Sequence, residues 1–153
     1  MSKLRVRHGD WVVVCDGKKA LLLENQGDEK FLNLQTREVF EHPDPSTHEL
    51  GTDAPGRSFS SVGTGRSAME QTDWHTQEEQ RFLRKLADHL NALVLAGETK
   101  SLIMVAPPRA LGVLREAYTV HVRNALHGEI DKDFVKLPVH EIEKHLMEKH
   151  LAA

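Results

Sequence analysis

The segment 43–73 limits the possible folds of this chain more than any other feature. It interrupts every regular hydrophobic pattern and separates a part that predicts strands from a part that predicts alternating helices and strands. Its sequence is PDPSTHELGTDAPGRSFSSVGTGRSAMEQTD. Prolines, glycines and serines recur too often in it for a regular helix or strand. A loop of about 30 residues is uncommon inside a compact domain, and such loops are usually functional or disordered. We therefore predict that residues 43–73 form a long functional loop.

The residues before this loop predict a run of antiparallel strands. WVVVCDG is a β-branched run that stops at a turn dipeptide, Asp16-Gly17. ALLLEN follows it, and Gly27-Asp28 then predicts a second turn. KFLNLQTREVFEH predicts one long strand or a strand pair. The first quarter of the chain is therefore expected to form a β-meander.

A long helix is predicted directly after the loop. Thr76 and Glu79 fit a capping box, in which each side chain satisfies a free amide of the first helical turn. Apolar residues then recur at helical spacing on one face. They are Phe82, Leu83, Leu86, Ala87, Leu90, Leu93 and Val94. Gly97 follows at a position where helices favour a residue that tolerates positive φ.

Strands and helices alternate over the rest of the chain. The apolar run 101–106 predicts a central strand, and Pro107-Pro108 predicts the start of a helix. Residues 119–125 predict a short helix, residues 127–137 a strand, and residues 138–150 a last amphipathic helix. The predicted core includes Trp11, Val13, Leu22, Phe82, Leu86, Leu90, Leu93, Ile103, Val105, Leu111, Leu114, Ile142 and Leu146.

The order of these elements, βββ-loop-αβαβα, predicts an α/β fold with helices on the faces of a mixed sheet. The ribonuclease H-like three-layer architecture has this order. A second core of ordinary size does not fit beside the first in 153 residues, so one domain spanning residues 1–153 is expected.

Composition limits the possible partners and compartments. A net charge of −3 excludes a global basic field, so any nucleic-acid contact must come from a local patch. The single cysteine, Cys15, excludes an internal disulfide framework and suits a reducing compartment. No apolar stretch approaches the roughly 20 residues that span a bilayer, and the basic start lacks a signal-peptide core. We expect a cytoplasmic protein without membrane insertion.

The histidines and the cysteine do not form a recognisable metal or nucleophile site. His140 and His145 are five residues apart, about 140° around a helix, so they cannot hold one ion from one face. Glu141 and His145 fit better as an i,i+4 pair on a solvated face. Cys15 lies inside an apolar run and is expected to be a buried structural thiol.

Three aspartates suggest a nuclease site but leave it incomplete. Asp131 and Asp133 are expected on one side of a strand, and Asp16 ends the first strand. A ribonuclease H-type nuclease holds two magnesium ions with carboxylates from the first strand, the first long helix and the next strand. The strand 101–106 contains no acid. We therefore predict no catalytic residue, no metal and no cofactor.

The window Ala54–Met69 contains two arginines and no acids. Its glycines expose backbone amides, and its serines add hydroxyls, which together with guanidinium groups suit a phosphate or a single-stranded nucleic-acid backbone. The alternative is a solvated loop whose glycines only permit turns. The predicted RNA- or anion-binding residues are Arg57, Ser58, Ser60, Ser61, Gly63, Gly65, Arg66 and Ser67.

Several segments resemble the bacterial host attachment protein family. They are WVVVCDGKKALLLE, DAPGRSFSSVGTGRSAMEQ, EEQRFLRKLADHL, LIMVAPPRALGVLREA and EIDKDFVKL, and the likeness covers nearly the whole chain. The blocks PGRSF, GxGRxAME and VAPPRxLGxLR are quite specific to this family. The family is named after a phenotype, the attachment of bacteria to host cells, which specifies no chemistry.

A more distant resemblance is to the catalytic middle domain of archaeal and eukaryotic class I release factors. That domain carries its Gly-Gly-Gln loop between the third strand and the first long helix, and residues 43–73 occupy the same place. The run 63–68, GTGRSA, is similar to the release-factor loop, with Arg66 at the position of the catalytic glutamine. Release factors also carry codon-reading and partner-binding domains, which we do not expect within these 153 residues.

This resemblance implies a binding module that places its Gly/Ser/Arg loop against the ribosome or tRNA. A hydrolase acting on peptidyl-tRNA or a related ester is one alternative. A protein-interaction module without RNA contact is another. In each case the effect on attachment is expected to be indirect.

Overall fold

The computed structural model describes the backbone of residues 5–41 and 68–152 and the side chains of residues 5–41 and 74–147. Its elements follow the chain in the order β1 (Trp11–Cys15), β2 (Lys19–Asn25), β3 (Leu34–Glu41), α3 (Ala68–Leu95), β4 (Leu102–Val105), α4 (Pro108–Ala117), α5 (Val120–Ala125), β5 (Leu126–Ile130) and α6 (Val139–Ala152). The predicted α/β fold with a mixed sheet is confirmed.

One sheet contains all five strands, in the order β3-β2-β1-β4-β5. β1 and β2 are antiparallel, as are β2 and β3, so the first part of the chain forms the predicted meander. β4 pairs parallel with β1, and β5 pairs parallel with β4. The sheet is therefore antiparallel on one side of β1 and parallel on the other.

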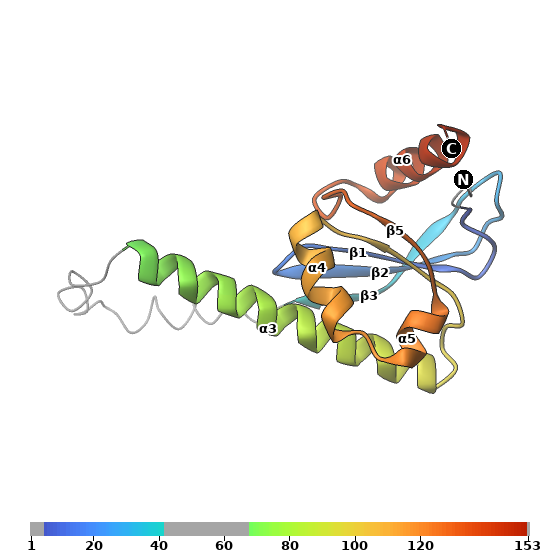
Figure 1. Cartoon of the computed structure of the whole chain (residues 1–153). Coiled ribbons are helices and arrows are strands. Elements are labelled where there is room, and N and C mark those ends of the chain that lie inside the picture. The colour runs from blue at the N-terminus through green and yellow to red at the C-terminus, as the bar shows by residue number, and fades with distance from the viewer. Residues whose placement is uncertain (1–4, 42–67, 153) are drawn as a thin grey trace, which may run out of the picture.

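Helices cover both faces of this sheet and create two separate apolar cores. α3, α4 and α5 lie on one face, and α6 lies on the other (Figure 1). The first core joins side chains such as Val13, Leu22 and Met104 to α3, α4 and α5. The second joins Val12, Ile103 and neighbouring residues to α6. The structure therefore has three layers, with the sheet in the middle.

The two central strands need this double cover because their side chains are apolar on both faces. All five residues of β1 and all four residues of β4 are buried. Alternate residues of a strand point to opposite faces, so a continuous apolar run requires a helix layer on each side. Every predicted core residue is buried except Leu93, which is partly buried near the end of α3.

The predicted start of the long helix at Thr76 is wrong. α3 begins at Ala68, so Thr76 lies inside the helix instead of capping it, and residues 68–73 belong to α3 instead of a loop. The sequence AMEQTDWH contains no proline or glycine and begins with strong helix formers, so nothing stops the helix at Thr76. The predicted end is confirmed, because Gly97 has a φ of +80° directly after the helix.

The predicted strand 127–137 is too long. β5 ends at Ile130, so Asp131 and Asp133 do not lie on a strand and are exposed. Phe134 and Val135 are buried in the second core, and the amide of Leu137 donates to the carbonyl of Phe134 in a turn. The chain leaves the sheet after Ile130 because these side chains pack beneath α6.

Leu90→Ala is expected to lower the free energy of unfolding by about 2–5 kcal/mol, because it removes a fully buried side chain from the first core. Urea denaturation measures the loss. Leu95→Ala is the matched control, since Leu95 is 60% exposed on the same helix and should change stability little. Equal losses in the two variants would show that the packed face of α3 is misassigned.

Candidate functional site

The parallel strands β1, β4 and β5 end at one edge of the sheet, which we call the carboxyl edge. Val14 of β1 lies beside Val105 of β4, and Val105 lies beside Ile130 of β5. In open α/β sheets, ligands bind outside the carboxyl ends of the strands, where the strand order changes direction. The carboxyl edge is therefore the first place to look for a functional site.

The elements on either side of the segment 42–67, β3 and α3, both reach this edge. β3 ends at Glu41, which pairs with Lys19 at the start of β2, while the neighbouring Ala20 pairs with Cys15 at the end of β1. The chain therefore leaves the sheet at the carboxyl edge. It returns through α3, which crosses the same edge where Glu79 lies against Gly17 of the β1–β2 turn.

α3 extends well past the sheet before it reaches this contact (Figure 1). Glu79 is eleven positions after Ala68, which corresponds to about 16 Å of helix. Trp74 on this projecting part is 56% exposed, and His75 is also exposed. The projecting part of α3 therefore presents an aromatic surface beyond the carboxyl edge.

A hydrogen bond between α3 and α4 reinforces this part of the structure. Arg109 in the first turn of α4 donates from Nη2 to Thr76 Oγ1 at 2.9 Å. Arg109 follows β4 by a short Pro-Pro connection, so its position at the carboxyl edge is fixed by the central strand. The sequence analysis assigned Thr76 to a helix cap and missed this contact, because the two residues are 33 positions apart.

The predicted binding residues all lie outside the described residues. They are Arg57, Ser58, Ser60, Ser61, Gly63, Gly65, Arg66 and Ser67. Their role stays a prediction.

The three aspartates have separate surroundings. Asp16 Oδ1 accepts hydrogen bonds from the amides of Lys18 and Lys19 at 2.8 and 2.9 Å, so it closes the β1–β2 turn. Asp131 and Asp133 are exposed in the connection between β5 and α6. Across residues 5–41 and 74–147, no group of three or more His, Cys, Asp or Glu residues is arranged to hold a metal ion.

Cys15 is the buried structural thiol that the sequence predicts. It is completely buried, and its Sγ contacts Met104 Sδ at 3.9 Å. Burial raises the pKa of the thiol to about 12, and the negative charges of Asp16 and Asp133 act in the same direction. The thiol therefore stays protonated at neutral pH, which makes it a poor nucleophile.

The sequence did not predict that the carboxylate of Asp10, at the opposite edge of the sheet, is buried. Asp10, which is 4% exposed, accepts a hydrogen bond from the amide of Arg7 at 2.8 Å and contacts His127 Nε2 at 3.1 Å. Asp10 therefore ties the chain before β1 to the first half of β5. No local pattern signals this contact, because His127 is 117 positions away.

Comparison with known families decides where the chain belongs. The model of the family described as "Protein required for attachment to host cells" matches residues 11–146. The chain belongs to this host attachment family. The match begins at the first residue of β1 and ends in α6, so it includes the whole sheet and both attachment points of the segment 42–67. The search of curated proteins finds no match.

Within the part of the chain that the structure describes, no helix is both long enough and apolar enough to cross a bilayer.

Gly17→Ala is expected to lower the free energy of unfolding by about 1–3 kcal/mol, because a Cβ there would lie 2.7 Å from Glu79 Cγ. Urea denaturation of the variant measures this loss. Adding Glu79→Ala should recover much of it, since the closest obstructing atoms are removed. Gly112→Ala is the control, because nothing lies within 4 Å of a Cβ at Gly112 in α4. A loss from Gly17→Ala that is the same with and without Glu79 would contradict the contact.

Alkaline pH is expected to destabilise the protein through Cys15. The thiol has a pKa of about 12 in the folded state and about 8.5 in the unfolded state, so only the unfolded chain loses the proton between these values. The stabilisation is therefore present below pH 8.5 and is lost as the pH rises towards 12. Between pH 8 and pH 10 the free energy of unfolding should fall by about 2 kcal/mol more than in Cys15→Ala. Parallel pH profiles for the two proteins would argue against a neutral buried thiol.

Proposed function

We propose that this host attachment family member is a cytoplasmic binding module that presents the segment 43–67, which precedes α3, to RNA of the ribosome or to tRNA. The observation that carries the proposal is the geometry of the carboxyl edge. The segment leaves the sheet there after Glu41, and α3 crosses the same edge at Glu79 on its return. The loop is therefore carried by the part of an α/β sheet that is best suited to bind a ligand.

The proposal includes a single ribonuclease H-like domain over residues 1–153 and a distant similarity to the release-factor middle domain. The sheet order β3-β2-β1-β4-β5, with an antiparallel meander followed by parallel strands, supports the ribonuclease H-like assignment. The position of the segment between the third strand and the first long helix supports the release-factor comparison.

The chemistry of the segment favours the sugar-phosphate backbone over base edges. Arg57 and Arg66 are the charged residues of the window 54–69, and guanidinium groups bind phosphate oxygens through paired hydrogen bonds. Contacts to phosphate position a protein on RNA but carry no base sequence. The exposed Trp74 on α3 adds a surface on which an unpaired base can stack.

Arg66 favours binding over ester hydrolysis. In the release-factor comparison it stands at the catalytic glutamine, whose compact amide both donates and accepts hydrogen bonds. Arginine only donates, is longer and is permanently charged, so it prefers a phosphate to an ester centre. The backbone amide at position 66 still permits weak stabilisation of an oxyanion. The module is therefore expected to affect attachment through translation instead of through chemistry on a surface ligand.

Co-sedimentation with purified ribosomes at a series of salt concentrations tests this function. Binding should weaken as salt rises, because RNA contacts release counterions. The double variant Arg57→Ala/Arg66→Ala should bind less and flatten the slope of log affinity against log salt by up to about two units. The control is Lys30→Ala/Lys100→Ala, which removes two exposed charges at the opposite edge of the sheet. The same slope for the Arg57/Arg66 variant and the unmodified protein would remove the segment from the binding site.

The two alternatives give different outcomes. A protein-interaction module predicts no salt-sensitive association with ribosomes. A hydrolase predicts release of a labelled peptide from ribosome-bound peptidyl-tRNA by the unmodified protein. Release that appears only with Arg66→Gln would support the release-factor comparison and assign the natural chain to binding.

A further inference from the structure

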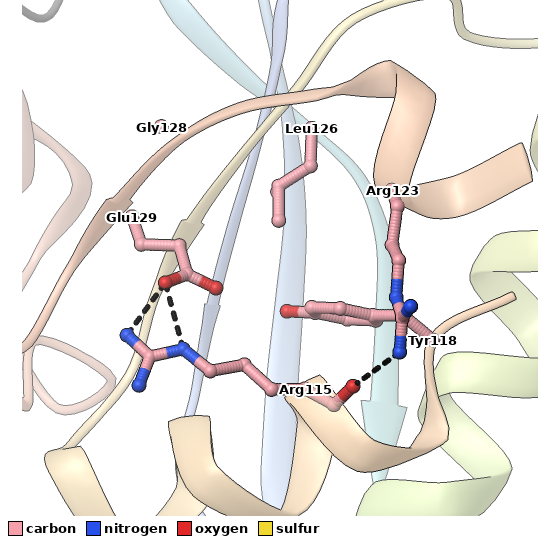
Figure 2. A pocket seen from close by; sticks show the side chains of 6 residues that line it. All are labelled: Arg115, Tyr118, Arg123, Leu126, Gly128 and Glu129. Atoms are coloured by element: carbon pink, nitrogen blue, oxygen red, sulfur yellow. Dashed lines mark hydrogen bonds and ion pairs between the residues drawn. The ribbon is translucent and has the colours of Figure 1, made fainter. Parts of the chain in front are cut away.

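A hollow lies between the end of α4, α5 and β5. Its volume is about 650 Å³, and Figure 2 shows the six residues that line it: Arg115, Tyr118, Arg123, Leu126, Gly128 and Glu129. Leu126 pairs with Leu102 at the start of β4. Glu129 pairs with Met104, one position before the carboxyl edge, so the hollow extends along most of β5.

A tyrosine with an unpaired hydroxyl forms one wall of this hollow. Tyr118 is only 7% exposed, and its Oη has no hydrogen-bond partner within the described residues. Buried tyrosine hydroxyls are nearly always hydrogen-bonded, because an unpaired one loses its contacts with water without replacement. Figure 2 shows the Tyr118 hydroxyl pointing between Leu126 and Glu129. The wall therefore contains a buried group that can both donate and accept a hydrogen bond.

The neighbouring ion pair leaves a carboxylate oxygen available. Arg115 donates from Nε and Nη2 to the same oxygen of Glu129, Oε1, at 3.0 and 2.6 Å. Figure 2 shows the other carboxylate oxygen on the side of Tyr118. The Tyr118 Oη atom is itself buried, so a ligand contacts it only after a lining side chain shifts, and the Arg115 side chain beside it is 58% exposed.

Arg123 supplies a positive charge at the other end of the Tyr118 ring. It donates from Nη2 to the backbone carbonyl of Arg115 at 3.2 Å, which holds the guanidinium beside the ring (Figure 2). Arg115 and Glu129 neutralise each other, so the lining carries one surplus positive charge, that of Arg123. The hollow thus has a cationic end at Arg123 and an acceptor end at Glu129, with Leu126 between them.

We propose that this hollow binds a small carboxylate that carries an amine or a hydroxyl several bonds away. The carboxylate contacts Arg123, and the amine or hydroxyl donates to Glu129 and contacts the Tyr118 hydroxyl. The carbon chain lies against Leu126. Such a ligand satisfies both polar ends and the buried hydroxyl at once, which neither a simple anion nor a simple amine does.

Titration with 4-aminobutyrate tests the proposal, with the backbone amide of Gly128 followed by NMR. Saturable binding is expected, and butyrate and butylamine, which each lack one polar end, should bind several-fold more weakly. Arg123→Gln should weaken binding of 4-aminobutyrate roughly tenfold or more, because it removes a charged hydrogen-bond donor. Tyr118→Phe should weaken it about threefold while keeping the ring in the core. Arg84→Gln, at an exposed arginine of α3, is the matched control and should leave the affinity unchanged.

Three outcomes would overturn the proposal. One is the absence of saturable binding up to tens of millimolar. A second is equal binding of butyrate and 4-aminobutyrate, which would remove Glu129 and Tyr118 from recognition. The third is unchanged affinity in both Arg123→Gln and Tyr118→Phe, which would place the ligand elsewhere. Melting curves of the variants confirm that each is folded.

Discussion

The parallel pairing of β1 with β4 is the interaction on which the rest of this structure depends. Both strands are buried on both faces, so they cannot be stable until helices cover each side. For this reason α3 and α4 pack on one face of the sheet and α6 packs on the other. It also sets the carboxyl edge, because the ends of β1 and β4 determine where the following turn and the start of α4 lie. This pair of strands therefore determines the edge of the sheet at which the chain enters the proposed binding segment.

Much of the fold follows from local sequence. The β-branched run of β1 and the apolar run of β4 have only one stable environment, the centre of a covered sheet. Pro108 starts α4 because proline fits the first turn of a helix, and Gly97 follows α3 because glycine tolerates positive φ. In each case the residue itself restricts the backbone conformation, so the sequence alone is sufficient to predict the element.

Other features could not be predicted because they depend on distant partners. The capping box at Thr76 and Glu79 is locally convincing, yet Glu79 packs on the β1–β2 turn and Thr76 accepts a hydrogen bond from Arg109. β5 ends early because Phe134 and Val135 pack under α6, which the apolar pattern of the segment does not reveal. Asp10 in a Gly-Asp turn looks like an ordinary loop residue, and only the fold brings His127 to it. Composition was sufficient to predict the candidate binding segment. The edge of the sheet at which the chain enters that segment became clear only from the register of β3 with β2.

The projecting part of α3 has a mechanical consequence. Arg109 holds α3 at Thr76, and the eight positions from Thr76 back to Ala68 form a lever arm about 12 Å long. A tilt of about 10° in the packed half therefore moves Ala68 by about 2 Å relative to Thr76. The packing of side chains such as Phe82 against the sheet controls this tilt. A substitution deep in the first core can thus change where α3 begins in space, and with it the geometry of a site that the substituted residue never touches.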